Sequence, residues 1–343
     1  LIAVALGALL SGALTKTGLF KYIDQRVGSR GAANFKGMLP ILHEGTPWGF
    51  TLGEMPDLIG ETFLVTGANV GLGYWTAYHL AAKRGQVTLG CRSKPKCAKA
   101  AKEIRQGTGG SVETLQLDLS SFKSVRAAAK TFAAKHRSLD SLVLNAGVMI
   151  PPFSLTEDGL ESQIGTNHFG HFLLTQLLMP QLEAAAAQRG VATVVSVSSM
   201  AHYDSYTEGI LSSIERMNDA STYSRVSAYG QSKLANVLFA QELAERVKGK
   251  GILVNSLHPG GVDTELARHG FDLIKHFSTT LGEFLEKNSL SLVAWRPQDA
   301  ALTELYCAVG PEVRQGKVTG KYYHPIAREN RPDKHAFNAS LQK

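Results

Sequence analysis

Short apolar runs alternate with longer, helix-like segments along most of the chain, and this alternation constrains the fold more than any other feature. The runs are TFLVT (62–66), QVTLG (86–90), VETLQLD (112–118), LDSLVLN (139–145), ATVVSVS (192–198) and ILVNSLH (252–258). Such alternation predicts a parallel sheet covered on both faces, because parallel strands need long crossover connections. We therefore expect an α/β, doubly wound fold: a three-layer αβα structure around a seven-stranded parallel sheet, with an N-terminal extension.

The first apolar run leads into a glycine-rich turn, VTGANVGLG (65–73), which directly precedes a helix-like segment. Glycines at such a turn let the backbone bend sharply and approach a pyrophosphate, whose charge the helix N-terminus stabilises. An ordinary glycine-rich turn is the alternative for this motif taken alone. In doubly wound sheets the carboxyl ends of the strands bind ligands, so the turn is a candidate nucleotide site.

A tyrosine and a lysine, Tyr229 and Lys233, stand four positions apart in the helix-like stretch AYGQSKLANV (228–237). This spacing puts both side chains on one face of a helix. An ammonium beside a phenol lowers the phenol pKa, which would make Tyr229 a proton donor and acceptor near neutral pH. Pairs at this spacing also occur on helices without a catalytic role, so the pair alone leaves both interpretations open.

The glycine-rich turn has the form Thr-Gly-x3-Gly-x-Gly, and with the motifs that follow it the chain resembles the short-chain dehydrogenase/reductase family. These motifs are LNAG (144–147), TNHFGHFLLT (166–175), VSVSSMAH (195–202), YGQSK (229–233) and HPGGVDTEL (258–266). The resemblance covers about residues 60–325 and implies a Rossmann fold. The motifs NHFGHF, SSMAH and HPGGVDTEL are most similar to those of the retinol dehydrogenase-like branch. Its members are often membrane-attached and act on lipophilic carbonyls or alcohols.

The resemblance implies four catalytic residues. Tyr229 exchanges a proton with the substrate oxygen while a nicotinamide exchanges a hydride, and Lys233 lowers the pKa of Tyr229 and binds the nicotinamide ribose. Ser199 holds the substrate oxygen, with Ser198 as the fallback. Asn167 interrupts its helix and holds a water that relays protons to Lys233; a surface or capping asparagine is the alternative. The segment 200–228 is longer than in the basic family pattern and is expected to line or cover the substrate cleft.

The segment after the second apolar run, LGCRSKPK (89–96), indicates which nicotinamide cofactor is used. Arg92 stands where a basic residue pairs with the 2′-phosphate of NADP, Lys94 and Lys96 follow, and no acidic residue lies between Arg92 and Glu103. NADP(H) is therefore favoured over NAD(H), with a solvated basic loop as the alternative. The other residues that the resemblance implies at the cofactor are Gly67, Asn69, Val70, Gly71, Leu72, Gly73, Asp118, Leu119, Asn145, Ala146, Gly147, Tyr229, Lys233, Pro259, Gly260, Val262 and Thr264.

The N-terminal residues favour membrane attachment. LIAVALGALLSGALT (1–15) carries no charge and five basic residues against one acidic residue follow by position 36. The stretch is shorter than the roughly 20 apolar residues of a membrane span, and a targeting segment or a helix packed on a partner are the alternatives. By the positive-inside rule the basic flank keeps the main body on the cytosolic or equivalent side. We expect an extension and candidate anchor in residues 1–59, the Rossmann domain in 60–325 and a C-terminal tail in 326–343.

Composition narrows the partners and the compartment. The formal net charge of +7 comes without a long basic run, so we expect no nucleic-acid partner. The three cysteines, Cys91, Cys97 and Cys307, are an odd number and lack a zinc-type spacing, so the sequence supports neither a disulfide framework nor a metal site. A reducing compartment is therefore expected. Together with the predicted membrane attachment, this favours the endoplasmic reticulum or another organelle membrane. His168 and His171 have no third ligand at a suitable spacing, so we interpret them as packing histidines.

Two classes of function follow. The first is an NADP(H)-dependent oxidoreductase that interconverts a small lipophilic carbonyl and alcohol, of the retinoid, steroid or lipid aldehyde class, with Tyr229 as general acid/base. The alternative is an accessory nucleotide-binding subunit of a larger membrane complex with a structural or redox-sensing role, which the N-terminal extension motivates. The enzyme is favoured because all four catalytic positions are filled.

Overall fold

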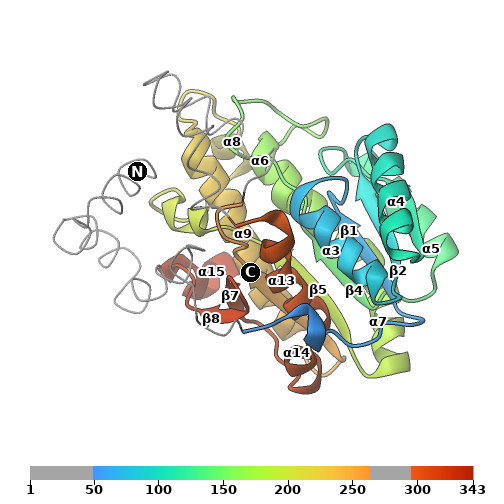
Figure 1. The fold of residues 1–343 in the computed structure, drawn as a ribbon. Coiled ribbons are helices and arrows are strands. Elements are labelled where there is room, and N and C mark those ends of the chain that lie inside the picture. Colours follow the sequence, from blue (N-terminus) through green and yellow to red (C-terminus); the bar gives the residue numbers. More distant parts are fainter. Residues whose placement is uncertain (1–48, 263–294, 343) are drawn as a thin grey trace, which may run out of the picture.

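A computed structural model describes residues 49–262 and 295–342, which form one eight-stranded sheet with helices on both faces (Figure 1). The strands lie in the order β3-β2-β1-β4-β5-β6-β7-β8. They are β1 (Thr62–Thr66), β2 (Gln86–Cys91), β3 (Val112–Gln116), β4 (Ser141–Leu144), β5 (Ala192–Val197), β6 (Ile252–Leu257), β7 (Tyr322–His324) and β8 (Arg328–Asn330). The predicted doubly wound α/β fold is confirmed.

The edge of the sheet beyond β6 differs from the prediction of seven strands. β7 is the seventh parallel strand, and β8 runs antiparallel to it as an eighth. Each has three residues, too few for an apolar run to be visible in the sequence. β8 comes from residues 326–343, predicted to be a tail, as do the short helices η8 (Lys334–Phe337) and α15 (Ala339–Gln342).

The chain enters the sheet at its centre and fills it in two directions. β1 pairs with β2 on one side and with β4 on the other, and both pairings are parallel. β3 extends the first side, and β5, β6 and β7 extend the second. Because the strand order reverses between β1 and β4, the carboxyl ends of these two strands border the crevice where doubly wound sheets bind their ligands.

Two groups of helices cover the two faces of the sheet. One consists of α3 (Gly71–Ala82), α4 (Lys94–Thr108) and α13 (Pro297–Val309), and α3 lies beside α13 (Figure 1). The other consists of α5 (Phe122–Lys135), α7 (Gly170–Arg189) and α9 (Arg225–Arg246). Strand β1 serves both cores: Phe63 and Val65 pack in the first and Leu64 in the second. Successive side chains of a strand point to opposite faces, which explains the division.

Serine caps fix where two of the helices on the second face begin. The side chains of Ser121 and Ser224 accept a backbone N–H from the first turn of α5 and of α9. Such caps satisfy N–H groups that have no partner within the helix. The remaining described elements are η4 (Leu52–Glu54), α6 (Ser162–Ile164), η5 (Gly165–Phe169), η6 (Met200–Asp204), α8 (Ile214–Met217) and α14 (Pro311–Gln315).

The segment 200–228, predicted to line or cover the substrate cleft, folds against the loop that follows β4. Tyr223 donates a hydrogen bond from Oη to the Pro151 carbonyl at 3.2 Å, and Asn218 donates from Nδ2 to the Gly159 carbonyl at 2.6 Å. η6 and α8 lie within this segment. It is therefore an ordered part of the domain, and its role at the substrate stays a prediction.

Most of the predicted membrane anchor lies outside the described residues, which begin at Gly49. Among the helices of residues 49–262 and 295–342, none combines the length and the apolar character that crossing a bilayer requires. Membrane attachment through the N-terminal residues stays a prediction.

Candidate active site

The glycine-rich turn between β1 and α3 packs directly on the segment that follows β4. Gly67 has φ 68°, and a Cβ added there would lie 2.9 Å from the Ala146 Cα. A Cβ added to Gly73 would lie 2.4 Å from Asn145 Nδ2. These two positions therefore require glycine. α3 begins at Gly71, so the turn presents a helix N-terminus at the switch point, an arrangement that fits a pyrophosphate.

Hydrogen bonds join the ends of β1 and β4. Asn145 Nδ2 donates to the Thr66 carbonyl at 2.8 Å, and the Ala146 N–H donates to Thr66 Oγ1 at 3.0 Å. His171 continues the network, because its Nε2 lies 2.8 Å from Thr66 Oγ1 and its Nδ1 lies 3.0 Å from the Asn167 carbonyl. Burial lowers the pKa of His171 to about 3, so the ring is neutral, donates from Nδ1 and accepts at Nε2.

Asn167 lies in a π-helical turn, η5, immediately before α7, which is the interruption of the helix that the sequence predicted. Its Oδ1 accepts from the Val148 N–H at 2.7 Å, and its Nδ2 donates to the Val148 carbonyl and to Ser232 Oγ, both at 2.9 Å. The side chain is fully buried. The alternative of a surface asparagine is thereby excluded.

Tyr229 and Lys233 lie on the buried side of α9, at 5% and 3% exposure. Lys233 Nζ lies 5.7 Å from the centre of the Tyr229 ring and donates to the Val197 carbonyl at 3.0 Å. A Cβ added to Gly147 would lie 3.0 Å from Asn167 Oδ1 and 3.6 Å from Lys233 Nζ. Asn167 and Lys233 therefore meet at Gly147, at the carboxyl ends of β4 and β5, and Tyr229 lies beside Lys233.

The two serines after β5 have different surroundings. Ser198 is buried, and its Oγ donates to the Lys233 carbonyl at 2.7 Å. Ser199 Oγ accepts from the Ala201 N–H at 3.2 Å, and the Ser199 hydroxyl acts to lower the pKa of Tyr229. Ser199 is thus the serine beside the tyrosine, while Ser198 holds α9 against the sheet.

The pKa of Tyr229 contradicts the sequence prediction. Burial raises this pKa to about 12, and the hydrogen bond from Ser199 only partly opposes the rise. Burial also lowers the pKa of Lys233 to about 8, partly offset by the carboxylate of Glu304. The net shift of this pKa in the chain by itself is therefore opposite to the lowering that the sequence predicted. The sequence indicates the neighbouring charge but does not indicate the loss of solvent around the phenol.

The residues predicted at the adenosine end of the cofactor lie after β2 and β3. Arg92, Lys94 and Lys96 are exposed, and the Arg92 carbonyl accepts from Gln116 Nε2 at 2.6 Å. The half-buried Asp118 accepts at Oδ1 from the backbone and hydroxyl of its neighbour Ser120, whereas Leu119 is buried. Of the turn residues, Val70 is the most open, with 41% exposure, and Asn69 and Leu72 are half-buried.

The loop after β6 closes the same end of the sheet. The His258 N–H donates to the Tyr323 carbonyl at 2.8 Å, which ties the residue before Pro259 to β7. Gly260 has φ 95°, and a Cβ there would lie 2.4 Å from Trp295 Cδ1, while Val262 pairs with Trp295 in an isolated bridge. Thr264, predicted at the cofactor, lies outside the described residues.

Two residues near the site were not assigned from the sequence. His202, within the SSMAH motif, lies with Nδ1 2.6 Å from the Ser199 carbonyl and accepts at Nε2 from the Asp333 N–H at 3.0 Å. Glu304 on α13 is fully buried and accepts from Thr76 Oγ1 at 2.6 Å, and burial raises its pKa to about 7. The motif could have indicated His202. No sequence signal marks Glu304.

A disulfide joins Cys91 and Cys97, whose Cα atoms lie 5.9 Å apart. The argument against a disulfide is therefore wrong for this pair, while Cys307, which also lies among the described residues, is free. Cys91 ends β2, and Cys97 lies in the first turn of α4, so the chain folds back and brings them within disulfide reach. Spacing in the sequence does not show this reversal.

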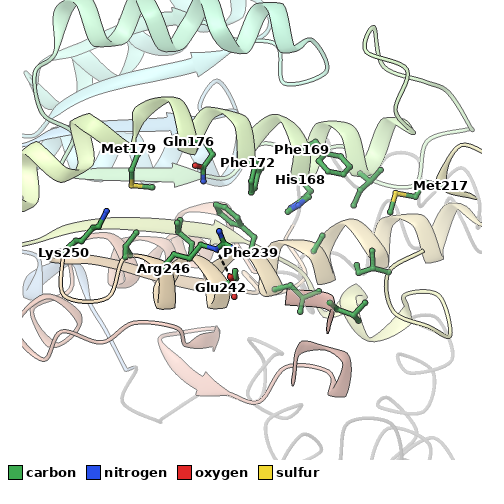
Figure 2. A pocket seen from close by; sticks show the side chains of 17 residues that line it. His168, Phe169, Phe172, Gln176, Met179, Met217, Phe239, Glu242, Arg246 and Lys250 are labelled. Atoms are coloured by element: carbon green, nitrogen blue, oxygen red, sulfur yellow. Dashed lines mark hydrogen bonds and ion pairs between the residues drawn. The ribbon is translucent and has the colours of Figure 1, made fainter. Parts of the chain in front are cut away.

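A cavity of about 590 Å³ lies apart from these residues, between α7 and α9 (Figure 2). Apolar side chains such as Phe169, Phe172 and Phe239 point into it. Arg246 and Glu242 form an ion pair at 2.7 Å on its border. None of the four predicted catalytic residues lines this cavity.

Comparison with known proteins places the chain among oxidoreductases. Residues 61–211 and 208–272 match the family model described as short chain dehydrogenase. The chain is 42% identical to human retinol dehydrogenase 13 over 273 residues, which cover 79% of this chain and 78% of that protein. It is 41% identical to the chloroplastic short-chain dehydrogenase TIC 32 A of Brassica napus over 270 residues, covering 76% of this chain and 79% of that protein.

Solved structures agree with the fold. An uncharacterised protein from Mycobacterium paratuberculosis superposes with a TM-score of 0.63 at 34% identity, covering 86% of this chain and 93% of that chain. Pseudomonas aeruginosa RhlG, in an active-site complex with NADP, superposes with a TM-score of 0.60 at 25% identity, covering 78% of this chain and 96% of that chain.

Proposed function

Because this chain belongs to the short-chain dehydrogenase family, we propose that it is an NADP(H)-dependent oxidoreductase that interconverts a lipophilic carbonyl and alcohol by hydride transfer. Membership makes the chain an oxidoreductase acting on CH–OH groups, related to retinol dehydrogenases. The meeting of Asn167 and Lys233 at Gly147, with Tyr229 beside Lys233 on α9, is the observation that carries the proposal.

The chain's own residues handle the proton of this reaction. During reduction the Tyr229 phenol donates its proton to the carbonyl oxygen, and the Ser199 hydroxyl donates a hydrogen bond to the same oxygen. The raised pKa keeps the phenol protonated at neutral pH, which is the form that donates. Lys233 stabilises the phenolate that is left after proton transfer. Asn167 fixes the Val148 backbone and the Ser232 hydroxyl through its hydrogen bonds. A nicotinamide dinucleotide, when bound, supplies or takes the hydride.

The cofactor preference rests on the exposed cations after β2. Arg92, Lys94 and Lys96 are free to approach a 2′-phosphate, and a guanidinium matches phosphate geometry. The printed description of RhlG, which names NADP, supports the same choice. Gly67, Gly71 and Gly73 would hold the pyrophosphate, and the other residues predicted at the cofactor would line it from the ends of β3, β4 and β6.

The proposed substrate is a small lipophilic aldehyde, ketone or alcohol. Relatives named retinol dehydrogenase support an apolar substrate. The apolar residues at 1–15 support action at a membrane surface, where such a substrate dissolves. The ordered segment 200–228 is the proposed wall of the substrate cleft.

A screen of NADPH oxidation with retinoid, steroid and fatty aldehydes tests the proposal. We expect turnover with at least one of them and a loss of at least about 100-fold in kcat in Tyr229→Phe, because general acid catalysis commonly contributes this much. Tyr78→Phe is the matched control, since the Tyr78 hydroxyl donates to the Gly107 carbonyl at 3.2 Å and Phe keeps the ring contacts of Tyr78. Undiminished turnover in Tyr229→Phe would overturn the mechanism. Absence of turnover with every carbonyl and both cofactors would favour the accessory role.

A further inference from the structure

The disulfide between Cys91 and Cys97 encloses the segment that carries the three exposed cations. Cys91 is the last residue of β2, and Cys97 lies in the first turn of α4. Arg92, Lys94 and Lys96 lie between them. The side chains of both cysteines are buried, whereas those of the three cations are exposed. The disulfide therefore closes a small loop whose outward side is the proposed 2′-phosphate site.

The backbone of this loop is fixed at both ends. The Leu117 N–H donates to the Cys91 carbonyl at 3.0 Å, and the Cys97 N–H donates to the Ser93 carbonyl at 2.9 Å. Both sulfur atoms belong to the core beneath α3, α4 and α13. Reduction removes the covalent link between the end of β2 and the first turn of α4, so that these hydrogen bonds and the core packing alone hold the loop.

We propose that Cys91 and Cys97 are a reversible redox pair that controls the affinity of the enzyme for NADP(H). The proposal rests on the proposed function, because it assigns the control to the 2′-phosphate contact of Arg92. In the disulfide form the loop holds Arg92 in place before the cofactor binds. In the dithiol form the same side chain must be ordered on binding, which lowers affinity. NAD(H) lacks the 2′-phosphate, so its affinity is insensitive to the state of the pair.

The chemistry is exchange with a low-molecular-weight disulfide such as glutathione disulfide. The thiolate of one cysteine attacks a sulfur of glutathione disulfide and releases one glutathione thiolate. The second cysteine then attacks the mixed disulfide and releases the other. Two protein thiols are oxidised and one disulfide is reduced to two thiols, so electrons balance. Both sulfur atoms are buried, so the exchange requires a local opening of the first turn of α4, and the three exposed cations then favour the thiolate form of the cysteines.

The test compares cofactor binding by the full-length protein in its two states. Protein treated with glutathione disulfide should have one reactive thiol after denaturation, and protein treated with dithiothreitol should have three. Titration should show that reduction weakens NADPH binding about fivefold to tenfold, the effect of having to order one or two side chains, and changes NADH binding less than about twofold. Cys97→Ser should bind NADPH weakly under both conditions. Cys307→Ala is the matched control and should keep the full response, because Cys307 is free and buried on α13.

The outcomes separate this inference from the proposed function. Three reactive thiols in the protein treated with glutathione disulfide, or equal NADPH affinity in the two states, would overturn the redox pair. Arg92→Ala tests the cofactor site on its own. If that variant loses NADPH affinity while reduction has no effect, the redox inference fails and the NADP(H) preference stands. If it loses none, the NADP(H) preference itself fails.

Discussion

The residues proposed for proton transfer and those proposed for phosphate binding differ in their surroundings. Asn167, Tyr229 and Lys233 are buried, and hydrogen bonds hold the side chains of Asn167 and Lys233, whereas Arg92 and Lys94 are exposed. A side chain of the buried set is part of the packing as well as of the chemistry, so its substitution changes turnover and also changes stability, in either direction. The exposed set acts through charge in water, so its substitution changes cofactor affinity alone and depends on salt.

The largest effect is expected for Asn167→Ala. The variant removes hydrogen bonds to the Val148 backbone and to Ser232, and leaves buried polar groups unpaired. We expect the free energy of unfolding to fall by about 3 kcal/mol, the sum expected for groups of this kind, and turnover to fall with it. Urea denaturation measures the change. Asn338→Ala, at an exposed site near the C-terminus, is the control and should cost less than about 1 kcal/mol.

Lys233→Met should separate stability from chemistry. Burial lowers the pKa of Lys233 to about 8 from 10.5, so the unfolded chain binds this proton more tightly than the folded chain. The buried ammonium therefore lowers the free energy of unfolding. This penalty has its full size below about pH 8 and becomes smaller as the pH rises towards 10.5. Turnover should be lost in the variant.

We expect Lys233→Met to raise the free energy of unfolding by about 1–2 kcal/mol at pH 7 and by less at pH 10. The Val197 carbonyl keeps a partner, because Asn236 Nδ2 also donates to it at 3.1 Å. Denaturation curves at the two pH values measure the difference. Lys321→Met, at an exposed lysine, is the control and should show little change. A variant less stable than the wild type at pH 7 would show that Lys233 stabilises the fold.

Arg92→Ala should change cofactor affinity and leave stability unaffected. The variant should raise KM for NADPH about tenfold, equal to the loss of about 1.4 kcal/mol in binding, and should leave KM for NADH unchanged. Added salt should raise KM for NADPH in the wild type and much less in the variant, because salt screens exposed charges. Equal losses for the two cofactors would show that Arg92 does not contact the 2′-phosphate.

Lys94→Ala should have the smallest effect, about a twofold rise in KM for NADPH, because exposed flexible charges contribute little individually. The comparison with Arg92→Ala is made at the same salt concentration. A tenfold rise in KM for NADPH in Lys94→Ala would show that Lys94, in the first turn of α4, makes the main phosphate contact instead of Arg92.

The local sequence pattern predicted most of the strands. It did not predict the shortest strands or the contacts that form when the chain reverses direction. The six apolar runs coincide with β1 to β6, because each strand is long enough to show its pattern. The three-residue β7 and β8 carry no such pattern. The pairing of Cys91 with Cys97 depends on the reversal between β2 and α4, which spacing does not reveal.

The site was predictable as a set of residues and unpredictable as an electrostatic environment. The motifs indicated Asn167, Ser199, Tyr229 and Lys233, which the structure brings together. The pKa of Tyr229 is raised, whereas the sequence predicted that it is lowered. The reason is that burial depends on every segment packed around the phenol, which the local sequence does not show. His202, beside the Ser199 carbonyl, was quoted in a motif without a role, since its partner at Asp333 lies 131 positions further along the chain.

Single-turnover kinetics of the preformed complex with NADPH test most directly whether Tyr229 delivers the proton. Wild type and Tyr229→Phe are each mixed with an active lipophilic aldehyde, and the loss of NADPH absorbance is followed. We expect equal NADPH affinity in the two proteins and hydride transfer slowed at least about 100-fold in the variant. Equal transfer rates would show that Tyr229 does not deliver the proton, because a phenylalanine has no proton to give.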